Sequence, residues 1–150
     1  MKKRLILLFV VLVCCVSGCR LFRDPAIASL GNYRTKELYS EGAVQDFTDY
    51  GKYTFDKAHP EDSSYFEPLT EDSMQTFCRY LDDFEGLVAS LRETDPEGEL
   101  VSHYDFDRTI LSEGDYLYLY IDSDYPEYGN YTLYLFDAET LTMYYFHNNV

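Results

Sequence analysis

The stretch YLYLYI at residues 116–121 decides the fold of this chain. Tyr alternates with Leu and Ile along it, and a period of two residues is typical of a β-strand with one aromatic and one apolar face. Residues 131–136 (YTLYLF) and 141–146 (LTMYYF) are similar in composition, and the four residues between them, 137–140, suit a hairpin loop. We therefore expect an antiparallel β-meander over about residues 100–147.

Two further strands are expected before this stretch. From Glu99 onward the pattern favours a period of two residues, which predicts a strand at 100–106 and a shorter one at 108–111. Residues 112–115 (SEGD) are turn formers and separate these strands from YLYLYI.

A long amphipathic helix is expected at about residues 71–92. Thr70 is a suitable N-cap, and Glu71 and Asp72 place negative charge at the positive end of the helix dipole. Apolar residues recur at spacings of three and four and give one apolar face. These residues are Met74, Phe77, Cys78, Leu81, Phe84, Val88 and Leu91. A helix followed by strands indicates an α+β fold, with this helix on the apolar face of the meander.

The segment before this helix has weaker patterns. Residues 44–55 (VQDFTDYGKYTF) fit a helical stripe by spacing and a strand by composition, and we favour a short helix. Another short helix is expected at residues 25–30, with Asp24 as its N-cap and Pro25 at its first position. Residues 19–42 as a whole mix charges with Pro, Gly and Ser without a sustained period, which predicts a tether.

The N-terminal residues have the parts of a signal sequence. Residues 2–4 (KKR) are cationic, and residues 5–16 form an uncharged apolar run. This run is too short to span about 30 Å of hydrocarbon as a helix. Val16-Ser17-Gly18-Cys19 then resembles the lipobox of a bacterial lipoprotein signal. The resemblance implies that residues 1–18 are removed and that Cys19 receives acyl chains such as palmitate.

This resemblance divides the chain and implies a location. Residues 1–18 are the signal peptide, 19–42 the lipidated cysteine with its tether, and 43–150 a single α+β domain outside the cell membrane. The lipid on Cys19 is the expected membrane contact, because two acyl chains form a stable anchor. Two alternatives remain: an ordinary secretory signal would leave Cys19 as an unmodified thiol, and a single-pass anchor would need a longer apolar run.

The cysteine content and the net charge argue against two classes of protein, those held by disulfides and those that bind nucleic acid. Cys14 and Cys15 leave with the signal and Cys19 is acylated, so only Cys78 stays in the domain and no structural disulfide is expected. The chain has 12 Lys and Arg against 27 Asp and Glu, a net charge of −15. Loss of residues 1–18 removes three further positive charges. A domain this acidic is expected not to bind nucleic acid.

Tyrosine is the most abundant aromatic residue, with 16 copies in the chain. Tyr116, Tyr118 and Tyr120 share one face of their strand and are candidates for partner binding, since Tyr combines flat apolar area with a polar tip. The other interpretation is that strand-forming amphipathic residues cover a partly exposed sheet. The sequence favours the second interpretation.

The loop at residues 122–130 is a candidate cation site. Asp122, Asp124, Glu127 and Asn130 supply oxygen atoms of the kind that calcium prefers. Their spacing does not match an EF-hand loop, and a chain rich in carboxylates contains such clusters by chance. The sequence therefore favours a solvated polar loop without a specific cation site.

Catalysis has little support in the sequence. His59, His103 and His147 are scattered along the chain, and Gly-x-Ser-x-Gly, His-Glu-x-x-His and Cys-x-x-Cys motifs are absent from it. Cys78 lies on the apolar stripe of the long helix, which favours a buried, inert thiol. We expect a protein that is not an enzyme and that needs no cofactor.

Four segments extend the comparison beyond the signal: residues 46–50 (DFTDY), 83–86 (DFEG), 135–140 (LFDAET) and 144–149 (YYFHNN). With them, most of the mature part resembles small, uncharacterised proteins of Gram-positive Firmicutes. The resemblance implies a Gram-positive cell surface, with the anchor in the outer leaflet of the single membrane, and it implies no activity or site.

These observations predict a membrane-anchored, extracytoplasmic lipoprotein that acts as a non-catalytic interaction or accessory module. Its partner would be a protein or another component of the envelope. A surface protein that binds a small ligand or calcium through the loop at 122–130 is one alternative, and an envelope enzyme is another.

Overall fold

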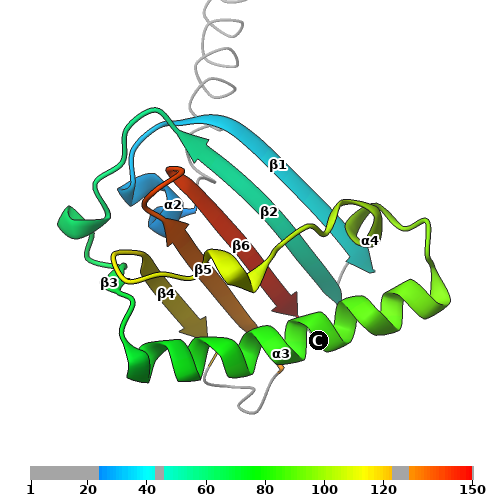
Figure 1. Ribbon diagram of the computed structural model, residues 1–150. Helices are drawn as coiled ribbons and strands as arrows, with labels where there is room; N and C mark the ends of the chain where they lie inside the picture. Colours follow the sequence, from blue (N-terminus) through cyan, green and yellow to red (C-terminus); the bar gives the residue numbers. More distant parts are fainter. Residues whose placement is uncertain (1–23, 43–45, 123–128, 150) are drawn as a thin grey trace, which may run out of the picture.

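The computed structural model describes residues 24–42, 46–122 and 129–149. Six antiparallel strands form one sheet in the order β1-β2-β6-β5-β4-β3 (Figure 1). The strands are β1 (Tyr33–Gly42), β2 (Phe47–Phe55), β3 (Glu67–Pro68), β4 (Tyr116–Ile121), β5 (Tyr131–Asp137) and β6 (Thr142–Asn149). The helices are α2 (Pro25–Ser29), α3 (Glu71–Thr94), α4 (Glu99–His103) and the short 3-10 helices η1 (Pro60–Asp62) and η2 (Arg108–Ile110). The expected α+β fold, with a long helix on a meander, is confirmed.

Both faces of the sheet are covered, which gives the molecule two apolar layers. The long helix α3 runs across one face (Figure 1), where Phe84 packs edge to face on Phe146 with ring centroids 5.3 Å apart. On the other face, Ile27 and Leu30 pack in a cluster that includes Met143 of β6. Successive side chains of a strand point to opposite faces, so the central strands contribute to both layers.

The long helix begins where the sequence predicts. Thr70 Oγ1 accepts a hydrogen bond from the backbone N–H of Ser73 at 3.2 Å, and Ser73 Oγ accepts one from the N–H of Thr70 at 2.9 Å. This reciprocal capping box satisfies two N–H groups that the first turn leaves unpaired. Phe77, Leu81, Phe84 and Val88 of the expected stripe are buried.

Strand β2 replaces the short helix expected over residues 44–55, so that prediction is wrong. It lies between β1 and β6 and pairs with both. Tyr50 belongs to the layer under α3 and Tyr53 to the layer under α2. A strand covered on both faces loses the alternation of apolar and polar residues, which explains the ambiguous pattern. Gly51 suits this position, because a Cβ there would lie 3.0 Å from the carbonyl oxygen of Glu37.

The tether expected over residues 19–42 is wrong for the part that the structure describes. Helix α2, predicted at residues 25–30, belongs to the domain, and so does β1. β1 pairs with β2 along its length, from Tyr33 opposite Phe55 to Gly42 opposite Phe47, although most of its side chains are exposed. β1 is an edge strand, and exposed charged side chains on such a strand discourage pairing with another chain, so its sequence is largely polar. The domain therefore begins near residue 25 and not at residue 43.

The strands expected at 100–106 and 108–111 are also wrong, because α4 and η2 occupy these positions. Leu100 and Val101 are both buried, although a strand would point them to opposite faces. The side chain of Asp107 accepts a hydrogen bond from the N–H of Thr109 at 2.9 Å. This local bond favours a turn over a strand ladder.

Asp24 fixes α2 on the sheet through three hydrogen bonds. Its Oδ1 accepts from the backbone N–H of Ala26 at 2.8 Å and of Ile27 at 3.1 Å, as expected of an N-cap. Its Oδ2 accepts from the hydroxyl of Tyr134 at 2.7 Å. One carboxylate therefore caps the helix and also joins it to β5.

Replacing Asp24 with Ala should lower the free energy of unfolding by about 2–3 kcal/mol. The variant loses an N-cap, worth about 1 kcal/mol, and removes the charged acceptor of the Tyr134 hydroxyl, worth about 1.5 kcal/mol or more. Urea unfolding of the full chain measures the change. Asp24→Asn is the control, because Asn also caps helices and accepts a hydrogen bond. Equal losses in the two variants would contradict this role.

Asp105 should make stability depend on pH in a defined direction. Partial burial acts to raise the pKa of Asp105, but hydrogen bonds from Lys52 Nζ at 2.7 Å and the Tyr50 hydroxyl at 2.8 Å outweigh it, so the pKa lies below its ordinary value. A carboxylate with a lowered pKa in the folded state stabilises the fold above its unfolded-state pKa, about 3.9, and loses this effect as the pH falls through the folded-state pKa.

Asp105→Asn should therefore be less stable than the wild type near pH 6, and the difference should shrink towards pH 3. Urea unfolding of both proteins at the two pH values measures it. A difference that is the same at both pH values would contradict the ion pair.

Candidate functional site

Three tyrosines from neighbouring strands form a row on the α2 side of the sheet. The register pairs Tyr118 of β4 with Tyr134 of β5, and Tyr134 with Tyr145 of β6. The rings of Tyr118 and Tyr134 stack with centroids 5.3 Å apart, and Tyr145 meets Tyr134 edge to face at 5.4 Å. Tyr116 and Tyr120 lie on the same face, because each is two residues from Tyr118 along β4.

This tyrosine row lines a groove with a volume of about 340 Å³. The groove lies where the start of α2 meets the sheet, and Tyr65, from the chain before β3, closes against Tyr118 with ring centroids 5.4 Å apart. The other lining residues are Asp24, Pro25, Ala26, Tyr120, Thr132 and His147. We call this feature the tyrosine groove.

The three partner-binding candidates of β4 differ in their surroundings. Tyr116 and Tyr118 are partly buried and pack against the apolar layer under α2. Tyr120 is 52% exposed, and it lines the groove together with Tyr118. Tyr116 therefore contributes to packing alone, whereas Tyr118 and Tyr120 also present aromatic surface to the groove.

Tyr118, Tyr134 and Tyr145 keep their hydroxyl protons at neutral pH. Burial raises the pKa of Tyr118, Tyr134 and Tyr145, and the hydrogen bond to Asp24 raises that of Tyr134 further. The groove therefore presents neutral phenol rings, whose faces carry partial negative charge.

A buried carboxyl group lies on the same face of the sheet, but it is not among the residues that line the groove. Asp49 of β2 lies directly opposite His147 of β6, so the two side chains share this face of the sheet. Asp49 is only 9% exposed, and its Oδ1 has no hydrogen-bond partner among the described residues. An unpaired polar atom in such a position is uncommon, since burial without a partner costs free energy.

His147 does not supply the missing partner. Its Nδ1 lies 2.8 Å from Thr132 Oγ1 and 3.1 Å from the carbonyl oxygen of Tyr131. Burial lowers the pKa of His147, although the nearby Asp49 carboxylate acts in the opposite direction. The imidazole is therefore mainly neutral at pH 7 and leaves the carboxylate of Asp49 without a neighbouring cation on β6.

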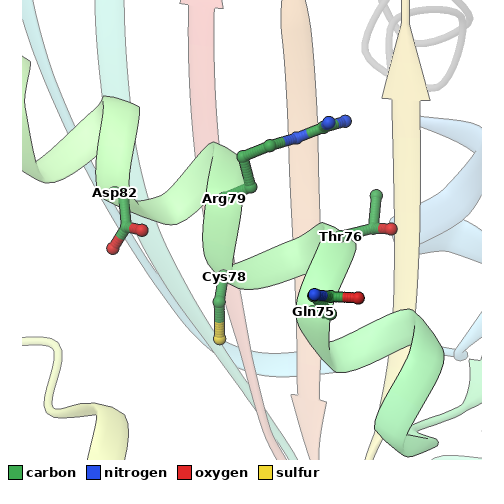
Figure 2. A pocket seen from close by; sticks show the side chains of 5 residues that line it. All are labelled: Gln75, Thr76, Cys78, Arg79 and Asp82. Atoms are coloured by element: carbon green, nitrogen blue, oxygen red, sulfur yellow. The ribbon is translucent and has the colours of Figure 1, made fainter.

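A second hollow, of about 540 Å³, lies on α3 (Figure 2). Its lining residues are Gln75, Thr76, Cys78, Arg79 and Asp82. Cys78 is partly exposed, which corrects the expectation of a fully buried thiol. Partial burial raises the pKa of Cys78, and its side chain and that of Arg79 point in different directions (Figure 2). These five residues therefore offer no activated nucleophile.

The predicted calcium ligands lie only partly within the described residues. Asp122 and Asn130 stand at the base of the loop, where the N–H of Asp122 donates to the carbonyl oxygen of Asn130 at 2.9 Å. Asp124 and Glu127 lie outside the described residues. Calcium binding by residues 122–130 stays a prediction.

The three histidines occupy separate parts of the fold. His59 lies with Glu61 and Asp62 in an exposed group of potential metal ligands, and its Nδ1 is 3.1 Å from Glu61 Oε1. His103 belongs to α4 and stacks on Tyr39 with ring centroids 4.1 Å apart. His147 lies in the tyrosine groove. His103 is the last residue of α4, where the sequence predicts a strand over residues 100–106.

The lipobox, residues 16–19, lies outside the described residues, and lipidation of Cys19 stays a prediction. Among the helices that the structure describes, none combines the length and the apolar character needed to cross a bilayer.

Most of the groove has no local signal in the sequence. Tyr134 and Tyr145 lie in expected strands, and the register across the hairpin at 137–140 is the signal that would place them beside Tyr118. Asp24 and Asp49 come from segments expected to be a tether and a helix, and nothing local in the sequence joins either to the sheet.

Comparison of the chain with protein-family models, curated proteins and solved structures found no match.

Proposed function

We propose that this protein is a lipid-anchored binding module on the extracytoplasmic face of a bacterial cell membrane, and that the tyrosine groove is its binding surface. The observation that supports this proposal most directly is the groove itself, in which tyrosines from three strands and a loop meet the first residues of α2. Its role is to recognise a protein or another envelope component.

Tyrosine suits recognition for physical reasons. A phenol ring buries a large apolar area while it fixes few rotatable bonds, and its hydroxyl donates or accepts a hydrogen bond. Tyr118 and Tyr134 are held by ring stacking, and Tyr134 is held further by Asp24. A partner would therefore meet a surface that is already ordered, and this lowers the entropy cost of binding.

The position of Asp24 links the groove to the proposed anchor. Asp24 lines the groove and follows Cys19 by five residues in the sequence. An extended chain spans at most about 3.6 Å per residue, so a lipid on Cys19 would keep Asp24 within about 18 Å of the membrane surface. The binding surface would then serve partners at or near the membrane.

A non-catalytic role agrees with the placement of the titratable side chains. His59 precedes η1 and lies beside Glu61, His103 of α4 stacks on Tyr39, and His147 of β6 lies beside Thr132. The partly exposed thiol of Cys78 has a raised pKa and lies on α3, in the other layer of the molecule.

Replacing Cys19 with Ser should abolish acylation. We expect an unprocessed precursor that takes up no labelled palmitate, because the thiol that accepts the lipid is missing. Metabolic labelling and electrophoretic mobility in the producing bacterium measure this. Cys78→Ser is the matched control and should be labelled and processed like the wild type. A Cys19→Ser protein that is cleaved and still bound to membranes would contradict the anchor.

A photo-reactive amino acid at position 120 should capture the partner in living cells. Tyr120 is exposed and lines the groove, so a partner bound there lies within reach of the reactive group. The same amino acid at Ser90, an exposed residue of α3 in the other layer, is the control. Capture from position 120 alone, weakened by Tyr118→Ser, is the expected result. Equal capture from both positions would contradict the groove as the binding surface.

A further inference from the structure

We propose that the tyrosine groove binds a proline-rich segment of a protein partner, in the polyproline II conformation and with basic residues beside the prolines. This inference rests on the proposed function and names the chemical class of the partner. It follows from the ring faces and hydroxyl donors that the groove presents, from the spacing of its tyrosines and from its charge.

The other polar groups that line the groove are engaged within the protein. Asp24 accepts two backbone N–H groups with Oδ1 and the Tyr134 hydroxyl with Oδ2. Thr132 Oγ1 and His147 Nδ1 lie 2.8 Å apart and form a hydrogen bond with each other. The groove therefore offers a ligand mainly the ring faces and the hydroxyl groups of its tyrosines.

Four tyrosine hydroxyls of the groove are open to a ligand. They make no hydrogen bond within the described part of the chain, where Asp49 Oδ1 is the one buried side-chain polar atom that lacks a partner, so these hydroxyls reach solvent. They belong to Tyr65, Tyr118, Tyr120 and Tyr145. A phenol hydroxyl donates one hydrogen bond, so the matching ligand has apolar groups for the rings and exposed acceptors for the hydroxyls.

A proline-rich segment has this combination. The prolyl ring is apolar, proline has no backbone N–H, and the carbonyl oxygens of a polyproline II helix make no internal hydrogen bonds. Grooves lined with aromatic side chains are a recurring site for such segments. A sugar fits less well, because its hydroxyls also need acceptors, and both oxygens of the Asp24 carboxylate already accept hydrogen bonds.

The spacing of the tyrosines matches the repeat of this helix. Tyr118, Tyr134 and Tyr145 lie on three adjacent strands, and successive ring centroids are 5.3 and 5.4 Å apart. Tyr134 is only 5% exposed, so a ligand meets mainly Tyr118 and Tyr145, which are two strand spacings or about 10 Å apart. Polyproline II rises about 9 Å in one turn of three residues. Prolines three positions apart, on a segment that crosses the strands, would therefore contact these two rings.

The charge of the site favours basic residues beside the prolines. Among the described residues that line the groove, Asp24 carries a carboxylate and none is Lys or Arg. The chain has a formal net charge of −15, so its field attracts a cationic segment before contact. The prolines would then supply the contact with the rings, and flanking Lys or Arg would supply the attraction over a longer range.

The test is a titration of the full chain, held in a non-ionic detergent, with a peptide of six prolines between two lysines. Tyrosine ring signals are followed by NMR, and those of Tyr118, Tyr120 and Tyr145 should shift. A peptide of the same length and charge, with alternating Gly and Ala in place of the prolines, should bind at least about tenfold more weakly, because it lacks the rings and the preformed helix. The proline peptide with glutamate at both ends should also bind more weakly at low salt.

Two matched variants separate the groove from adhesion to any accessible tyrosine. Tyr120→Ser removes an exposed ring of the groove and should weaken binding of the proline peptide about fivefold without lowering the midpoint of urea unfolding. Tyr39→Ser removes a ring from β1 in the layer under α3 and should leave binding unchanged. The same affinity in the two variants, or equal binding of the proline and Gly/Ala peptides, would overturn the proposal.

The outcome is also distinguishable from failure of the proposed function. Capture of a partner from position 120 together with no response to the proline peptide would overturn the proline-rich class alone. Shifts of the same signals with a chitin tetrasaccharide and not with the peptide would overturn it in favour of a glycan. Absence of capture and of any response would overturn the binding surface as well.

Discussion

The pairing of β2 with β6 is the constraint on which the rest of the structure depends. Eight consecutive residue pairs, from Phe47 opposite Asn149 to Thr54 opposite Thr142, join the N-terminal hairpin to the C-terminal meander. Because side chains alternate, this one register sends Tyr50 into the layer under α3 and sets Asp49 beside His147 on the other face. A slip of one residue would exchange the two faces, so the core and the groove share a single determinant.

The elements that sequence analysis predicts correctly are those whose burial shows in their own residues. Helix α3 has an apolar stripe on one side and an N-cap at Thr70. In β4, Tyr alternates with Leu or Ile. Both patterns can be recognised from the residues of the element itself. β2 is covered on both faces, while β1 is held by its backbone, and neither situation leaves a periodic pattern. The five residues of α4 are too few to establish a period, and tertiary burial decides their conformation.

Of the candidate site, the sequence predicts only the arrangement of the tyrosines within β4. Tyr116, Tyr118 and Tyr120 share a face by alternation within β4, which needs no knowledge of neighbours. Tyr134 and Tyr145 join this row only through the pairing of β4 with β5 and of β5 with β6, which depends on long-range packing. Cys19, Asp124 and Glu127 lie outside the described residues, so the expectations attached to them remain predictions.

The two edges of the sheet differ in length and in exposed charge. β3 is only two residues long, whereas β1 presents ten, with exposed charged side chains such as Arg34, Lys36 and Glu37. A strand edge is a template on which a neighbouring copy adds its own strand, and short or charged edges discourage this. With lateral crowding on a membrane, where a lipid anchor would bring many copies together, such edges would keep the molecules as separate, freely diffusing units.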